Sequence, residues 1–226
     1  MAEYAAVPAD MAHRFPGTVS LEQAALFEPA SVALHALRRA GTSPAAVAVV
    51  GLGPVGLFTA RLAAQRNVRR ITAVAVSAAR LELAAALGTT GLVDADRQED
   101  TGARIRELTG GEGVDATFEA VGSEATLRSC LTATRRGGRV VLVGLAREVS
   151  LDAFALVNDE QSILAGVGYR DTYPELIRLV SEQGLDLTQV VTSTIALDEL
   201  VSHGFEALLD GLGRSGQGPG RPGAAP

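Results

Sequence analysis

The sequence predicts an α/β fold built on a doubly wound, parallel sheet of six strands. Short apolar runs bounded by turn residues alternate with segments whose apolar residues recur at helical spacing. The helical segments are long enough to cross a face of the sheet, as the connections between parallel strands must. With 226 residues, of which 47% are hydrophobic, the chain can bury one substantial core.

The first apolar run, 46–50, contains no polar residue, as expected of a strand buried on both faces. The last predicted crossover helix has a serine at its N-cap, and arginines and glycines at its end. The predicted strands are 46–50, 71–76, 91–95, 114–122, 139–145 and 162–169, and the helices between them are 56–66, 77–88, 102–111 and 123–138.

Both ends of the chain lie outside this alternation. Residues 1–40 begin with a strand-like piece and lead into a helix. Residues 41–170 contain all six predicted strands. Residues 171–210 supply a helix at 171–184, a strand at 190–195 and a helix at 196–211, and the glycine- and proline-rich tail 211–226 is expected to be disordered.

Composition excludes several classes of function. All 20 basic residues are arginine, so a P-loop lysine, a Schiff-base lysine and the Tyr-Lys pair of short-chain dehydrogenases are impossible. The net charge of −6 argues against a nucleic-acid partner. Cys130 is the one cysteine and is expected in the core. Without a signal peptide or a membrane-spanning apolar stretch, we expect a cytoplasmic protein.

The stretch Gly51–Gly56, GLGPVG, follows a predicted strand and opens a predicted helix. In that context Gly51 permits a tight turn, Gly53 lets the backbone approach a pyrophosphate, and Gly56 allows close packing of helix on strand. The helix N-terminus attracts the phosphate charge. A glycine turn of another α/β protein, or a loop for S-adenosylmethionine, is the alternative.

Dinucleotide-binding domains also carry an acid at the end of the second strand, which holds the adenosine ribose. Ala75 occupies that slot, and 71–79 contains no carboxylate. An acid would repel a 2′-phosphate, so its absence leaves both NAD and NADP open, with a slight preference for NADP. Arg80, together with Arg69 or Arg70, is a candidate partner of that phosphate, although Arg80 is equally consistent with a solvated helix position.

With these motifs in place, the chain from Ala2 to about Asp210 resembles the zinc-dependent medium-chain alcohol dehydrogenases, in the branch of butanediol, sorbitol and threonine dehydrogenases. The segments FEPASVALHALRRAG, VVGLGPVGL, GGEGVDATFEAVG, GGRVVLVGL and GVGYRDTYPELIRLV carry the resemblance. It implies oxidation of a secondary alcohol, diol or polyol by hydride transfer to NAD(P). It also implies a homo-oligomer, because the sixth strand commonly pairs with a second subunit.

The resemblance also implies which residues bind the cofactor. The glycine loop would hold the pyrophosphate, and the loops after the fourth and fifth strands would flank the nicotinamide half. Carried over to this sequence, the cofactor-binding residues are Gly51, Gly53, Pro54, Val55 and Gly56, then Ala75 and Arg80, then Val121 and Gly122, and finally Val143, Gly144 and Leu145.

Zinc catalysis in that family depends on a cysteine and a Gly-His-Glu motif in an N-terminal domain. This sequence has no His-Glu dipeptide, so we expect it to begin after that domain and not to bind the zinc alone. The resemblance then implies that residues 1–40 are a remnant and linker helix of the catalytic domain, that 41–170 are the NAD(P)-binding Rossmann domain, and that 171–210 return toward the catalytic domain. Glu28 corresponds to a carboxylate near the metal. His35 lies two helical turns from Glu28, about 10 Å along one helix, too far for both to bind one ion. His13 and His203 have no ligand partner nearby in the sequence.

Two interpretations follow. The chain is either the cofactor-binding portion of a zinc-type dehydrogenase, or a stand-alone NAD(P)-binding module that regulates or docks without catalysis. Tyr169 and Arg170, after the sixth strand, are candidates for the edge of an alcohol pocket and equally for exposed loop positions.

Overall fold

The structure, a computed structural model, describes residues 4–41 and 44–209, and the predicted tail 211–226 lies outside them. The chain divides into two compact units, Met1–Val190 and Val191–Pro226. Among the described residues, no helix is long and apolar enough to cross a membrane.

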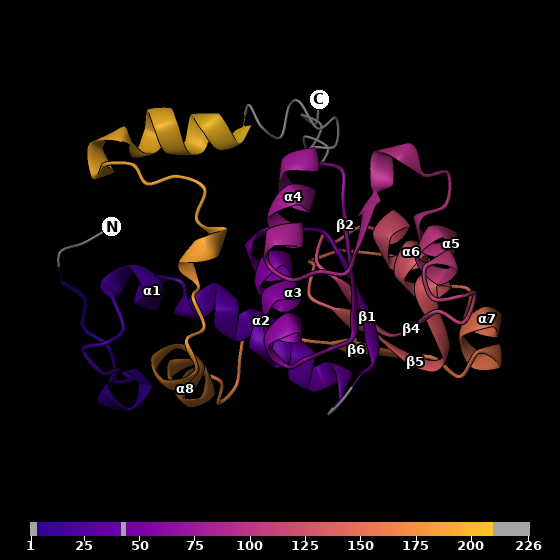
Figure 1. The fold of residues 1–226 in the computed structure, drawn as a ribbon, viewed down its shortest axis with the longest axis horizontal. Helices are drawn as coiled ribbons and strands as arrows, with labels where there is room; N and C mark the ends of the chain where they lie inside the picture. Colours follow the sequence, from indigo (N-terminus) through magenta and orange to yellow (C-terminus); the bar gives the residue numbers. More distant parts are fainter. Residues whose placement is uncertain (1–3, 42–43, 210–226) are drawn as a thin grey trace, which may run out of the picture. The chain divides into compact units, whose positions relative to one another are not determined.

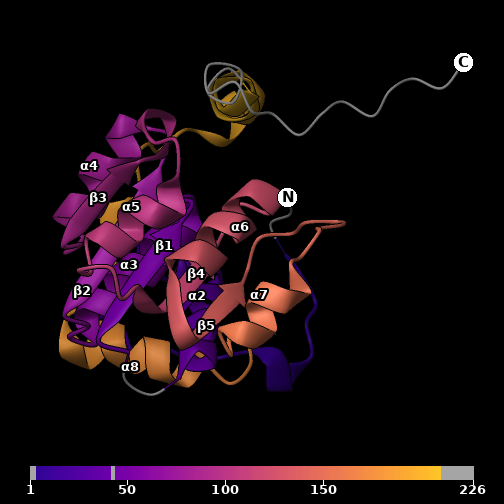
Figure 2. The ribbon, with the colours of Figure 1, turned by 90° about the vertical axis from the view of Figure 1, so that its right-hand side faces the viewer.

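The first unit is built on a six-stranded, wholly parallel sheet, as predicted. Its strand order is β3-β2-β1-β4-β5-β6, so the chain starts in the middle, builds outward to β3 and then outward to β6 (Figures 1 and 2). This is the order of a doubly wound dinucleotide-binding fold. The strands are β1 Ala46–Val50, β2 Arg70–Ala75, β3 Gly91–Asp94, β4 Val114–Glu119, β5 Thr134–Leu142 and β6 Ser162–Ala165.

Helices cover both faces of the sheet, and alternate residues of β1 show why. Val47 and Val49 belong to a core shared with α2, α3, α4 and α8, whereas Ala46, Ala48 and Val50 belong to a second core shared with α5 and α6. Figure 1 shows the two helical layers on opposite sides of the strands. The helices are α1 Leu21–Ala25, α2 Phe27–Ala40, α3 Pro54–Gln65, α4 Ala78–Ala86, α5 Thr101–Glu107, α6 Glu124–Ala133, α7 Ala153–Asn158 and α8 Tyr173–Gln183.

One glutamate joins three helices on the first face. Glu175, in the first turn of α8, accepts from Arg38 of α2 at 2.5 Å and from Arg66, which follows α3, at 2.8 Å. Burial opposes ionisation of Glu175, but the two guanidinium groups outweigh it and lower the pKa of the carboxyl group. With Leu176 and Val180 in the first core, these ion pairs fix α8 against the sheet's helical layer.

A second carboxylate holds the amino ends of the central strands together. Asp115, in β4, accepts from the backbone N–H groups of Ala45 and Ala46 at 2.6 and 2.9 Å and from Arg135 of β5 at 2.8 Å. Burial alone would raise its pKa, but these three hydrogen bonds and the charge of Arg135 prevail and lower the pKa of the carboxyl group. Asp115 therefore ties β1, β4 and β5 where they begin.

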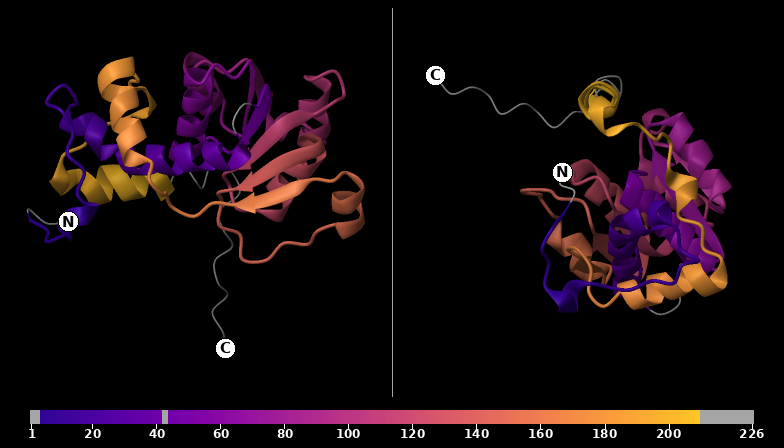
Figure 3. Two further views of the ribbon diagram at one scale, coloured as in Figure 1. Left: turned by 90° about the horizontal axis from the view of Figure 1, so that it is seen from below. Right: turned by 90° about the vertical axis from the view of Figure 1, so that its left-hand side faces the viewer.

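Three local predictions were wrong, and one helix was missed. The helix predicted at 123–138 ends at Ala133, and β5 starts at Thr134, because Thr134 pairs with Val114 across an irregularity in the ladder and its hydroxyl donates to the carbonyl of Cys130. The strand predicted at 190–195 is absent, since Thr188–Val190 is a 3-10 turn and 191–196 has no regular structure. The strand-like start contains only the 3-10 turn Ala9–Met11 between residues 4 and 19. α7, in the connection from β5 to β6 that runs along one edge of the sheet (Figure 3), was not anticipated.

The described part of the second unit is helical from Leu197 to Leu209, as predicted for 196–211. It begins with a 3-10 turn, Leu197–Glu199, and continues through a π-helical turn, Leu200–Phe205. Its side chains include several exposed apolar residues, namely Leu197, Val201, Phe205, Leu208 and Leu209.

Substituting Asp115→Asn should lower the free energy of unfolding by about 1–2 kcal/mol at pH 7, because three donors lose a charged acceptor. The pKa of Asp115 is depressed in the folded chain, so its stabilisation is complete above the unfolded pKa of about 4 and is lost as the pH falls further. Urea unfolding between pH 7 and pH 3 should show the difference from wild type shrinking toward acid pH. The exposed Asp96→Asn is the matched control, and an equal difference at every pH would contradict the assignment.

Candidate functional site

The candidate site is the crevice at the carboxyl ends of β1 and β4. These two strands pair in parallel at the centre of the sheet, yet the chain leaves β1 toward β2 and leaves β4 toward β5. The loops that follow them therefore diverge to opposite faces and open a crevice, which is where α/β sheets bind ligands. The sequence-predicted cofactor residues lie around this crevice.

The turn after β1 can only be made by glycine. Gly51 has φ +97°, in the left-handed region, and a Cβ there would lie 2.5 Å from Cγ2 of Val121 and 3.1 Å from the carbonyl carbon of Ala120. Its N–H donates to the carbonyl of Val74 at 2.9 Å, across from the end of β2. Gly51 is thus held between the end of β2 and the loop after β4.

The other two glycines of the loop have different physical roles. A Cβ on Gly56 would collide with the carbonyl oxygen of Gly51, so Gly56 is needed for packing. Gly53 has φ −69°, and no atom lies within 4 Å of the position that a Cβ would occupy there. Neither packing nor backbone conformation requires glycine at position 53, and the space above it is open to a ligand that contacts the backbone.

The loop delivers the N-terminus of α3 to the crevice. Pro54 is its first residue and is exposed, whereas Val55 is half-buried and packs against the first core. α3 has 12 residues, and its unpaired N–H groups at this end carry the positive end of the helix dipole. The geometry suits a phosphate group at the crevice.

The loops after β4 and β5 contact each other through glycines. Gly122 has φ +89°, and a Cβ there would lie 2.8 Å from the backbone nitrogen of Leu145. A Cβ on Gly144 would overlap the backbone nitrogen of Gly122 and lie 2.6 Å from Oε2 of Glu119. Beside these glycines, Val121 and Leu145 expose 53% and 88% of their surface, while Val143 packs against the first core. Apolar side chains therefore face solvent where the resemblance implies a nicotinamide ring.

At the end of β2, Ala75 is buried and Arg80 lies exposed in the following helix, α4. Among the described residues, no acidic side chain forms an ion pair with Arg80. Sequence reasoning missed Asp94, the last residue of β3. It pairs in register with Ala75 of β2 and forms an ion pair with Arg97 at 3.0 Å. Its position at the end of the neighbouring strand was a signal that the search of 71–79 could not include.

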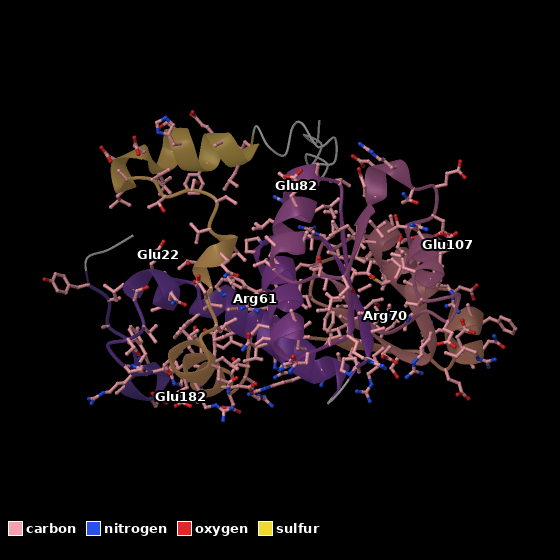
Figure 4. The ribbon with its side chains drawn as sticks, viewed as in Figure 1. Glu22, Arg61, Arg70, Glu82, Glu107 and Glu182 are labelled. Atoms are coloured by element: carbon pink, nitrogen blue, oxygen red, sulfur yellow. The ribbon has the colours of Figure 1, made fainter. Side chains whose placement is uncertain are left out.

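The prediction that Arg69 or Arg70 would bind a 2′-phosphate together with Arg80 was wrong. Arg70 is the first residue of β2 and Ala75 the last, so about 16 Å of extended strand separates them. Figure 4 shows Arg70 at the opposite end of the sheet from Glu82, which lies on α4. Arg80 is the one arginine of the three at the carboxyl edge.

The described residues do not form a zinc site. No group of three or more His, Cys, Asp and Glu side chains comes close enough together among them to hold a metal ion. Glu28 is exposed in the first turn of α2, and its charge, after burial and the hydrogen bond with Tyr169, helps raise the pKa of Tyr173. The predicted role of Glu28 near a metal stays a prediction.

The other candidate ligands have structural surroundings. Burial and the charges of Arg39, Arg38 and Arg170 lower the pKa of His35, and these cations would repel a metal ion. His13 stacks on Tyr173 with ring centroids 4.9 Å apart. In the second unit His203 lies 3.5 Å from Glu199.

Cys130 is confirmed as a core residue. It is fully buried in α6, and burial followed by the charge of Glu119 raises the pKa of its thiol. A thiol that stays protonated in the core is neither a nucleophile nor a ready metal ligand.

The larger hollows lie elsewhere on the first unit. One, of about 510 Å³, is lined by α5, α6 and α7, and another, of about 520 Å³, by residues 10–27 and 169–174. Tyr169 and Arg170 line the second one. A hollow of about 100 Å³ lies between α6 and the ends of β4 and β5, where Glu119, Leu127 and Gly144 are among the residues that line it. A dinucleotide would lie across an open edge, as its extended shape allows.

Comparison with known proteins matches residues 54–182 to the family described as zinc-binding dehydrogenase. The chain is 34% identical over 212 residues to (R,R)-butanediol dehydrogenase of Bacillus subtilis, covering 92% of this chain and 60% of that protein. It is 32% identical over 200 residues to sorbitol dehydrogenase of the same organism, covering 87% and 56%.

Solved structures agree with these relatives. The crystal structure of 2R,3R-butanediol dehydrogenase from Bacillus subtilis superposes with a TM-score of 0.80 at 34% identity, over 86% of this chain and 56% of that one. Alcohol dehydrogenase TADH from Thermus sp. gives 0.80 at 29% identity, over 88% and 58%. The chain thus spans about 60% of the length of these relatives or slightly less.

The contrast between Gly56 and Gly53 can be measured as stability. Gly56→Ala should lower the free energy of unfolding by about 1–3 kcal/mol, because the new methyl group overlaps the Gly51 carbonyl. Gly53→Ala should change it by no more than about 0.5 kcal/mol, because its surroundings are open. Chemical denaturation of both variants tests this, and equal losses would show that the loop geometry is misassigned.

Proposed function

Because the chain belongs to the zinc-binding dehydrogenases, the zinc-type medium-chain alcohol dehydrogenase family, we propose that it binds NAD or NADP across the carboxyl edge of its sheet. It would serve as the cofactor-binding portion of a dehydrogenase that oxidises a secondary alcohol, diol or polyol to a ketone. The observation that carries the proposal is the open space over Gly53 at the N-terminus of α3, in the crevice between β1 and β4.

The residues of the crevice divide into three contacts with the cofactor. Gly51–Gly56 and the N-terminus of α3 would hold the pyrophosphate. The exposed faces of Val121 and Leu145, with the backbone of Gly122, Val143 and Gly144, would flank the nicotinamide half. Ala75 and Arg80 would lie beside the adenosine ribose. When bound, the nicotinamide supplies the hydride acceptor, and the protein supplies its position and an apolar surface beside it.

The adenosine end is compatible with both cofactors. Ala75 stands where β2 usually carries an acid, and Arg80 is exposed there with no ion-pair partner among the described residues. Asp94 brings one carboxylate to the neighbouring strand, but Arg97 pairs with it. We therefore expect binding of both NAD(H) and NADP(H), with Arg80 favouring the phosphorylated form.

The substrate class is inferred from the relatives, which are named for 2,3-butanediol and sorbitol. Their zinc chemistry does not fit the described residues, which bring no three metal-binding side chains together. The second candidate function is a stand-alone NAD(P)-binding module that regulates or docks without catalysis. The position of β6 at the edge of the sheet supports a homo-oligomer. For the location of the protein, we propose the cytoplasm. The division of the chain at residues 40, 170 and 210 stays a prediction.

A titration with NADH and with NADPH tests the binding proposal. The chain contains no tryptophan, so the nicotinamide fluorescence can be followed without energy transfer from an indole. We expect saturable enhancement with both cofactors. If neither binds at high micromolar concentration, both candidate functions are wrong.

The role of Arg80 is tested by comparing the two affinities. Arg80→Ala should weaken NADPH relative to NADH by about threefold to fivefold, the worth of one exposed ion pair. Arg70→Ala is the matched control, since it removes the same charge at the other end of β2 and should leave the ratio unchanged. A change of ratio in the control alone would contradict the placement of the adenosine end.

Catalysis tests whether the chain alone is an active dehydrogenase. We expect the chain alone, supplied with zinc, NAD(P) and 2,3-butanediol, to show no turnover, because the described residues offer no three-ligand metal site. Zinc-dependent production of reduced cofactor, abolished by a chelator, would refute this and favour an active dehydrogenase.

A further inference from the structure

Glu119 is a buried carboxylate that the cofactor assignments leave without a role. It is the last residue of β4 and only 2% of its surface is exposed. A carboxylate is buried at this cost only when donors surround it. At the junction of the two loops that would flank the nicotinamide half, such donors are backbone groups of the loops themselves.

The side chain of Glu119 holds the loop after β4. Its Oε1 accepts from the backbone N–H groups of Val121 and Gly122, both at 3.0 Å, and from the hydroxyl of Thr126 in α6 at 2.7 Å. Oε2 accepts again from Gly122 at 3.1 Å. Both N–H groups therefore point inward to the carboxylate, which fixes the peptide planes of the loop and turns the Val121 side chain outward to solvent.

The backbone of the same residue holds the loop after β5. The carbonyl oxygen of Glu119 accepts from the N–H groups of Val143 and Gly144, both at 2.9 Å. Gly144 lies so close to the side chain that a Cβ there would be 2.6 Å from Oε2. One residue thus positions both nicotinamide-flanking loops, and the glycine above it is required by that contact.

We propose that Glu119 is a positioning residue, which orients the loops after β4 and β5 for the nicotinamide half of the cofactor without touching it. The inference rests on the proposed function. It predicts a selective defect, because the pyrophosphate cradle is built by the turn after β1 and by α3, whose hydrogen bonds do not involve the Glu119 side chain. Loss of the carboxylate should weaken binding of the nicotinamide half and spare the adenosine and phosphates.

The test compares NADH with ADP, which carries the adenosine and both phosphates but no nicotinamide. Glu119→Leu removes both side-chain acceptors, leaves the backbone carbonyl in place, and should weaken NADH about tenfold or more, the loss expected for charged hydrogen bonds. ADP should change by less than about twofold. Glu119→Gln keeps one acceptor oxygen and should lie between wild type and Glu119→Leu, and Thr126→Val removes one donor and should show a smaller, equally selective loss.

Two controls distinguish a selective binding defect from a general loss of charge or of folding. Glu107→Gln removes an exposed carboxylate of α5, which pairs only with Arg104 among the described residues, and should leave both ligands unchanged. Thermal unfolding of each variant identifies any that does not fold, in which case Glu119→Gln and Thr126→Val decide the outcome. A parallel loss of NADH and ADP, or no loss of either, would overturn the positioning role. Wild-type protein that binds neither ligand would instead overturn the proposed function.

Discussion

The parallel pairing of β1 with β4 is the constraint on which the rest of the structure depends. Both strands are buried from both sides, so their side chains fill two separate cores and commit the chain to helices on each face. Because the chain leaves the two strands in opposite directions, their carboxyl ends cannot be covered by the same connection. The crevice that results is a consequence of topology and needs no special side chain.

β4 carries a carboxylate near each end, and the two have complementary roles. Asp115 accepts hydrogen bonds from two N–H groups and an arginine at the amino edge, where β1 and β5 begin. Glu119 gathers the N–H groups of the loops at the carboxyl edge. The first stabilises the fold at an edge away from the crevice, whereas the second shapes the surface that would receive a cofactor. The same chemistry, a charged acceptor for backbone donors, therefore serves stability at one end and geometry at the other.

The sequence was sufficient for the sheet and the glycine loop, because both depend on local patterns. An apolar run such as 46–50 and a glycine triplet in strand–helix context have few alternative explanations. The early start of β5 could not be predicted, since it depends on Thr134 pairing with Val114 and on a hydroxyl that contacts Cys130. The partnership of Ala75 with Asp94 was equally out of reach, because it arises between strands. The positioning role of Glu119 could not be predicted either, because only the structure shows its burial and the donors around its carboxylate.

The central claim is that a dinucleotide lies across the carboxyl edge of β1, β4 and β5. Backbone amide chemical shifts of the ¹⁵N-labelled chain, recorded during titration with NADH, test it most directly. The claim predicts the largest changes at Gly51–Gly56, at Val121 and Gly122 and at Gly144 and Leu145, with little change at Arg69 and Arg70. Changes concentrated around Tyr169 and Tyr173, or at the amino edge of the sheet, would contradict it.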